Sequence, residues 1–237
     1  IMNANTYNHL YFNPNYDMDL YNFYCMNTLN IFSDASVRRK GKNSFDTCYS
    51  VVAVNENTII DSDTRIISNS TNNGGEIRGL RLALSIANKW INQYDFINIF
   101  SDSKISIIGL REYIYNWRYD KKTGKLINSS GSIVSNQEVF IECYYLLSNL
   151  DKLKPNRVQL FHQRGHINNN IKSLCKARES FKKENHINAD VNLNLINYLS
   201  TWNNYVDYNS RSTLRRTSSK IDYTDAIEFG LNGPLIK

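Results

Sequence analysis

Residues 29–36 read Leu-Asn-Ile-Phe-Ser-Asp-Ala-Ser, an apolar run that ends in the carboxylate of Asp34. A second apolar run, Phe96–Phe100, leads in the same way to Asp102. Glu76 opens a helical pattern, and Asp190 begins a late amphipathic segment. Clustered carboxylates repel one another and raise each other's pKa values. If the fold gathers these four acidic residues it requires a counter-cation, and hard oxygen ligands suit Mg²⁺ or Mn²⁺.

The hydrophobic pattern around these residues predicts an α/β fold. Three short strands joined by polar turns are expected within residues 29–67. The elements expected after them are an amphipathic helix over Glu76–Ile91, a strand over Phe96–Phe100, helices over Ser103–Trp117 and Gln137–Leu150, and a last strand over Arg157–His162. This order indicates a mixed sheet with helices on its faces. Adjacent parallel strands would bring Asp34 and Asp102 to neighbouring carboxyl ends, where open α/β sheets commonly build their sites.

The chain of 237 residues is long enough for one catalytic domain with extensions. We expect an N-terminal extension over residues 1–27, a catalytic domain over 28–207 and a basic C-terminal tail over 208–237. The 28 Lys and Arg against 22 Asp and Glu give a net charge of +6. This excess favours a polyanionic partner such as a nucleic acid.

The four cysteines are widely separated and form no C-x-x-C pair, so neither a zinc site nor a disulfide framework is indicated. A reducing compartment fits this usage. No apolar stretch approaches the roughly 18 residues needed to span a bilayer, and the N-terminus lacks a basic region followed by an apolar segment. We therefore expect a soluble, intracellular protein without membrane association, and a monomer.

Three segments resemble the ribonuclease H family, type 1. They are Ile31-Phe32-Ser33-Asp34-Ala35-Ser36, Thr71-Asn72-Asn73-Gly74-Gly75-Glu76 and Ile99-Phe100-Ser101-Asp102-Ser103, which match that family's D-x-S strand end, T-N-N-x-x-E helix start and T-D-S strand end. Val158–His166 resembles its last strand and Gly-His loop, and Asn188-Ala189-Asp190 resembles the element with its fourth carboxylate. The resemblance covers roughly residues 28–205. It implies a ribonuclease H-like mixed five-stranded sheet with helices on both faces.

The resemblance also implies an endonuclease that hydrolyses the RNA strand of RNA/DNA hybrids and leaves 5′-phosphate and 3′-hydroxyl ends. Two Mg²⁺ ions, for which Mn²⁺ could substitute, would be held by Asp34, Glu76, Asp102 and Asp190. Asp190 follows the loop histidine at a greater distance than the family's pattern has, so Asp207 is the alternative fourth carboxylate.

His166 resembles the family's mobile histidine, which assists proton transfer or product release. An imidazole titrates near neutrality and suits that role. His162 is expected to be structural, and His186 competes weakly for the same assignment.

Three regions are candidates for contacts with nucleic acid. Asn72 and Asn73 resemble residues that recognise the RNA 2′-hydroxyl, although Asn-Asn before a helix is also good loop and cap chemistry. The other two regions are the basic stretch with Trp117, Arg118, Lys121, Lys122 and Lys125, and an insertion over about 168–186 with Lys172, Lys176, Arg178, Lys182 and Lys183. Lysines and arginines in these regions would bind phosphates, while a solvated surface helix is the alternative for the insertion.

Two other functions compete with hybrid cleavage. A junction resolvase or another DNA nuclease of the same fold would gather four carboxylates as well. A catalytically silent nucleic-acid-binding module would keep the fold without the chemistry, and intact Asp34, Glu76 and Asp102 argue against it. The protein could act alone or beside a polymerase, and the sequence does not distinguish the two.

Overall fold

The structure, a computed structural model, describes residues 27–40, 45–168 and 170–216. Apart from Asn27, the expected N-terminal extension lies outside the described residues, as does the expected basic tail from residue 217 onward. Among the described residues, no helix has both the length and the apolar character needed to cross a membrane.

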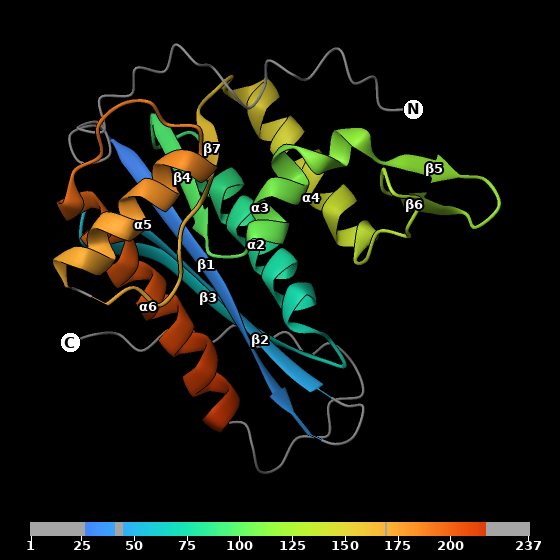
Figure 1. The fold of residues 1–237 in the computed structure, drawn as a ribbon, viewed down its shortest axis with the longest axis horizontal. Helices are drawn as coiled ribbons and strands as arrows, with labels where there is room; N and C mark the ends of the chain where they lie inside the picture. Colours follow the sequence, from blue (N-terminus) through green and yellow to red (C-terminus); the bar gives the residue numbers. More distant parts are fainter. Residues whose placement is uncertain (1–26, 41–44, 169, 217–237) are drawn as a thin grey trace.

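A five-stranded mixed sheet forms the centre of the fold (Figure 1). Its strands, in spatial order, are β3 (Thr58–Ser68), β2 (Phe45–Asn55), β1 (Thr28–Arg39), β4 (Phe96–Ser101) and β7 (Val158–His162). The strand β2 runs antiparallel to β1 and β3, whereas β1, β4 and β7 are parallel. This is the mixed five-stranded sheet that the sequence predicts.

Helices cover both faces of the sheet. One face carries α2 (Asn72–Trp90), α3 (Lys104–Arg111), the short 3-10 helix η2 (Tyr113–Asn116) and α4 (Gln137–Leu153), and the other carries α5 (Ile171–Glu184) and α6 (Leu193–Arg216) (Figure 1). A large apolar cluster fills the first interface, and a second cluster that includes Phe32, Phe100 and Phe161 fills the other. The alternating strand side chains thus supply two separate cores.

Three elements differ from the sequence-based expectation. The helix expected over Ser103–Trp117 ends at Arg111, because Glu112 leaves the helical region and a 3-10 turn follows. A hairpin of β5 (Arg118–Asp120) and β6 (Lys125–Ile127) projects from the domain (Figure 1). Its turn is built by the Asp120 side chain, which accepts bonds from two following backbone amides, and by Gly124 at φ +66°.

The third difference is the length of α6, which continues through Arg216 instead of ending before residue 208. Its last turns are fixed to β1, because Ser210 Oγ lies 2.6 Å from Ser36 Oγ and Arg38 donates to the Leu214 carbonyl at 2.5 Å. Residues 208–216 are therefore part of the folded domain.

The insertion over 168–186 contributes to the core through α5. Its buried side chains Leu174, Ala177 and Phe181 pack in the second cluster, and Phe181 stacks on Phe161 with ring centroids 6.0 Å apart. Lys172 and Lys176 lie on the exposed side of the same helix. The insertion is thus an amphipathic helix that extends the second helical layer.

Candidate active site

The parallel register of β1 and β4 brings two carboxylates together. Ser33 pairs with Ser101, the last residue of β4, and the residues that follow them in the chain are Asp34 and Asp102. Asp34 is 7% exposed, and its Oδ1 accepts a hydrogen bond from the Ala35 amide at 2.7 Å. Asp102 thus follows the carboxyl end of β4, and Asp34 lies beside it within β1, where the pairing with β4 ends and β1 continues to Arg39. The fold brings these two carboxylates together, as the sequence predicts.

The third carboxylate, Glu76, comes from the first turns of α2. Thr71 caps this helix by accepting a bond from Gly74 N at 3.1 Å. A Cβ at Gly75 would lie 2.2 Å from Thr47 Cγ2, so only glycine lets the helix start this close to the sheet. Glu76 is then fixed by bonds from Asn72 Nδ2 at 2.6 Å and Ser103 Oγ at 2.5 Å.

A pocket of about 390 Å³ collects these side chains. Its lining consists of Asp34, Ala35, Ser36 and Val37 from β1, Asn72 and Glu76 from α2, Asp102, His166, and Asp207 and Arg211 from α6. Four carboxylates from four segments of the chain therefore line one cleft.

Asp207, and not Asp190, is the α6-side carboxylate that lines this pocket. Asp190 is exposed before the start of α6, and its Oδ1 caps the Val191 amide at 2.9 Å. Asp207 lies 14 residues after Leu193, the first residue of α6. Since an α-helix rises about 1.5 Å per residue, roughly 21 Å of helix separates Leu193 from Asp207. The two acidic residues cannot both reach the cleft.

The pocket carboxyls are electrostatically strained. Burial, followed by the charges of Asp102 and other pocket carboxylates, raises the pKa of Asp34 to about 8. Burial also raises the pKa of Asp102, against a lowering hydrogen bond from Asn203, and burial raises the pKa of Glu76. In each case burial is the main cause, because little water surrounds the charged form, and at least one neighbouring carboxylate adds to it.

His166 lies at the rim of the pocket, with its side chain 67% exposed. Its Nδ1 is 4.0 Å from Asp207 Oδ2, and its Nε2 is 3.4 Å from Arg211 Nη2. The preceding Gly165 lies over Asp102, because an added Cβ would come 2.1 Å from Asp102 Oδ2. The Gly-His loop therefore covers one carboxylate and places the imidazole near another.

The family model for RNase H matches residues 26–190. The chain belongs to the RNase H family. The family consists of nuclease hydrolases that generally use divalent metal ions. The match ends at Asp190, so the whole of α6, with Asp207, lies beyond it.

Solved structures similar to this chain are RNase H domains of low sequence identity. The N-terminal RNase H domain of a Mycobacterium tuberculosis protein, solved as a fusion with maltose-binding protein, is 19% identical, covers 56% of this chain and 84% of its own, and has a TM-score of 0.38. RNase H1 from the archaeon Halobacterium salinarum is 16% identical over 68% of this chain and 99% of its own, with a TM-score of 0.38.

The prototype foamy virus RNase H domain is 17% identical over 75% of this chain and 94% of its own, with a TM-score of 0.47. The foamy viral protease-reverse transcriptase solved with an RNA/DNA hybrid is much longer, and the match spans 20% of it at 15% identity and a TM-score of 0.48, covering 69% of this chain. A search of curated proteins finds no match.

The donor set of this RNase H pocket fits divalent metal ions. Within residues 27–40, 45–168 and 170–216, no three His, Cys, Asp or Glu side chains lie close enough together to form a metal site as they stand. The pocket nonetheless offers four carboxylates as hard oxygen donors. The pKa values of Asp34, Glu76 and Asp102 are raised, in part by the charges of neighbouring carboxylates, and a cation relieves that repulsion. In the structure the guanidinium of Arg211 supplies a positive charge at one of these carboxylates, with Nε 2.7 Å from Asp207 Oδ1.

The other candidate binding residues lie outside the pocket, except Asn72. Asn73 is exposed in the first turn of α2. Arg118, Lys121 and Lys122 are exposed on the β5–β6 hairpin, and Lys172 and Lys176 on α5. Trp117 is partly buried and packs edge-on against Phe140, with ring centroids 5.0 Å apart. It therefore packs against the first apolar cluster immediately before β5.

Sequence reasoning missed two pocket features on α6. Arg211 lines the cleft, and Asn203 hydrogen-bonds Asp102. The signal was present, because Asn203, Asp207 and Arg211 are spaced four residues apart and therefore share one helix face.

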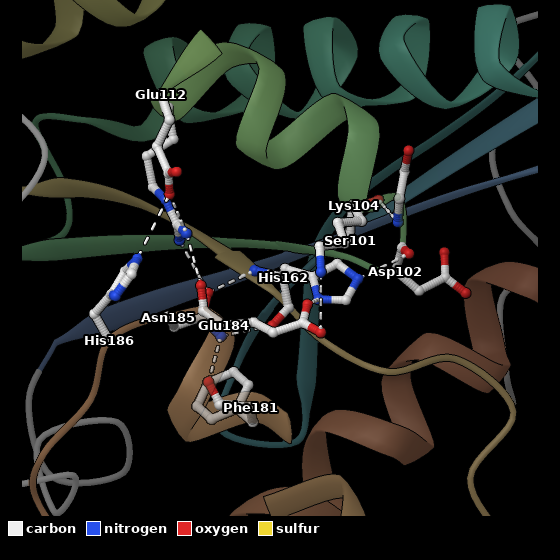
Figure 2. A network of polar contacts seen from close by, with 11 residues as sticks. Ser101, Asp102, Lys104, Glu112, His162, Phe181, Glu184, Asn185 and His186 are labelled. Carbon is white, nitrogen blue, oxygen red and sulfur yellow. Dashed lines mark hydrogen bonds and ion pairs between the residues drawn. The ribbon is translucent and has the colours of Figure 1, made fainter. Parts of the chain in front are cut away.

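A polar network behind the pocket joins β7 to α5 (Figure 2). His162 Nε2 is 3.1 Å from the carbonyl oxygen of Asp102, and His162 Nδ1 is 2.5 Å from Glu184 Oε2. Burial lowers the pKa of His162, against the opposing effect of Glu184. His162 therefore contacts the main chain that carries a pocket carboxylate, without lining the pocket itself.

Proposed function

We propose that this chain is an endonuclease that hydrolyses the RNA strand of RNA/DNA hybrids, leaving 5′-phosphate and 3′-hydroxyl ends. The main support for this proposal is that Asp34, Glu76, Asp102 and Asp207 line one pocket in a member of the RNase H family. These four residues would hold two Mg²⁺ ions, or Mn²⁺ in their place. The ions supply neutralisation of charge and a more acidic bound water.

The surrounding side chains hold these carboxylates in place before any ion binds. Asn72 and Ser103 fix the two oxygens of Glu76, and Asn203 hydrogen-bonds Asp102. Preorganised ligands reduce the reorganisation needed at the moment of reaction. His166, exposed at the rim beside Asp207, would move a proton between the pocket and solvent.

Recognition of the RNA strand would use Asn72. Its amide nitrogen is bonded to Glu76, which leaves the carbonyl oxygen to accept a bond from a 2′-hydroxyl. The exposed Asn73 in the next position is a second candidate for the same contact.

Basic residues on three sides of the domain would hold the phosphate backbones. One group is on the β5–β6 hairpin, with Arg118, Lys121 and Lys122, and a second is on α5, with Lys172 and Lys176. At a third position the end of β1 meets the last turns of α6, and Arg39, Arg215 and Arg216 are exposed at the ends of these two elements. Such contacts give affinity without base specificity.

The test is a cleavage assay on labelled RNA/DNA hybrid, RNA duplex, DNA duplex and four-way DNA junction, with Mg²⁺, with Mn²⁺ and with EDTA. We expect metal-dependent cleavage of the RNA strand in the hybrid, with 5′-phosphate ends. Preferred cleavage of the junction would refute the proposal in favour of a resolvase. Binding of hybrid without cleavage in either metal would show a silent binding module.

A further inference from the structure

His162, the last residue of β7, is the link between the insertion helix and the active site. Its side chain lies between Glu184, at the end of α5, and the carbonyl oxygen of Asp102 (Figure 2). His162 is 8% exposed, and the side chain of Glu184 is 20% exposed. Two polar contacts in such a dry environment are worth more than the same contacts on the surface.

Asn185 ties the same end of α5 to the backbone of β7. Its Oδ1 accepts a bond from His162 N at 2.9 Å, and its Nδ2 donates to His162 O at 2.6 Å. Because β7 is an edge strand of the sheet, these bonds satisfy backbone groups that a further strand would otherwise pair. His162 is therefore fixed through its main chain as well as its ring.

Arg111 connects this arrangement to α3, the helix that begins just after Asp102. Its side chain is 5% exposed and donates to Asn185 Oδ1 at 3.1 Å and to the Glu184 carbonyl at 2.7 Å. At the opposite end of α3, Ser103 is the N-cap and also bonds Glu76. The helix is thus held at the pocket by its first turn and on α5 by its last.

We propose that His162 and Glu184 are positioning residues that hold the Asp102 main chain so that its carboxylate faces Asp34. The catalytic consequence rests on the proposed function, whereas the positioning itself does not. The segment over 168–186 then has a role besides phosphate contact, because its helix supplies Glu184. Removing His162 takes away the side-chain partner of the Asp102 carbonyl, although Glu184 keeps its contact with Lys104 at 3.4 Å. Removing Glu184 leaves His162 Nδ1 without that contact, so the ring holds the Asp102 peptide less firmly.

The experiment compares His162→Ala, Glu184→Ala and His162→Gln with His186→Ala as the matched control. His186 belongs to the same network but contacts Glu112, at 3.7 Å, and its side chain is 59% exposed. Two quantities are measured besides cleavage: Mn²⁺ affinity by calorimetry, and hydrogen exchange of the peptide over residues 100–106 in the metal-free protein. Steady-state kinetics on hybrid separate kcat from KM.

We expect His162→Ala and Glu184→Ala to weaken Mn²⁺ binding by about 10- to 100-fold, the usual effect of removing a group behind a metal ligand. Their kcat should fall with little change in KM, and exchange over residues 100–106 should accelerate. His162→Gln should recover most of the loss, because its amide can donate to the Asp102 carbonyl. His186→Ala should match the wild type in all three measurements.

Unchanged Mn²⁺ affinity and unchanged exchange in both alanine variants would overturn the proposal, as would equal losses in His186→Ala. If the alanine variants do not fold, Glu184→Gln replaces them, since it keeps the size of the side chain and removes its charge. A wild-type protein that neither binds Mn²⁺ nor cleaves hybrid would refute the proposed function. In that case the exchange measurement still decides whether His162 and Glu184 hold the Asp102 peptide.

Discussion

Asp34→Asn should change how the stability of the metal-free protein depends on pH. Burial and neighbouring carboxylates raise the Asp34 pKa from 3.8 to about 8 in the folded chain. Between these values the folded state keeps a proton that the unfolded chain has released. Stability from this group is therefore fully present below pH 3.8, declines as pH rises through this interval, and is lost above pH 8.

The magnitude follows from one bound proton. A difference of one proton between the folded and unfolded states changes the free energy of unfolding by about 1.4 kcal/mol per pH unit. From pH 5 to pH 7, the free energy of unfolding of the wild type should therefore fall by roughly 3 kcal/mol more than that of Asp34→Asn. With a urea m-value of about 2 kcal/mol/M, this corresponds to a relative shift in the unfolding midpoint of more than about 1 M.

The assay is urea unfolding at pH 5, 6 and 7 in EDTA, for wild type, Asp34→Asn and Asp190→Asn. Asp190 is the control because it is an exposed carboxylate outside the pocket. Mn²⁺ added to the wild type should flatten its pH dependence, since a bound cation favours the charged carboxylates. Parallel pH profiles for wild type and Asp34→Asn would refute the argument that the Asp34 carboxyl is strained.

Four further outcomes are expected. Asp102→Asn should abolish hybrid cleavage while leaving the circular dichroism spectrum unchanged, because a neutral amide is a poor ligand for a hard cation. Asp207→Asn should lower the cleavage rate by orders of magnitude and Asp190→Asn should leave it near wild type; the reverse ranking would move the fourth carboxylate back to the start of α6. His166→Ala should slow turnover but retain Mn²⁺ affinity in calorimetry, since this side chain moves protons; loss of metal binding would contradict that role. Replacing Lys172, Lys176, Lys182 and Lys183 by Gln should flatten the dependence of hybrid affinity on salt, and unchanged log-log slopes would show that α5 makes no phosphate contact.

Local sequence signals predict most of the sheet and three of the four pocket carboxylates. The runs before Asp34 and Asp102 are short, apolar and bounded by polar residues, which is how strands buried on both faces read. The T-N-N-G-G-E segment marks the start of α2 and gives Glu76 its place within the first turns. These signals act over a few residues, so they survive changes elsewhere in the chain.

The β5–β6 hairpin was not predicted because its strands have only three residues each. A pattern that short has no periodicity to detect, and its turn is built by the side chain of Asp120. The end of the helix at Arg111 was missed for a related reason. The apolar spacing continues through Ile114, which is buried from a 3-10 turn instead of an α-helix.

The fourth carboxylate depends on a global property, the length of the segment between β7 and the pocket-facing part of α6. The α5 insertion lengthens that segment, and α6 then runs for 24 residues. Of the two candidate carboxylates, Asp190 is nearer in sequence to the Gly-His loop, but Asp207 is the one that lines the pocket. Helical spacing resolves the ambiguity. Asn203 hydrogen-bonds Asp102, and Asp207 follows one turn later on the same face. A carboxylate at that spacing faces the cleft wherever the preceding loop begins, which is why the helix face identifies it better than its distance from His166.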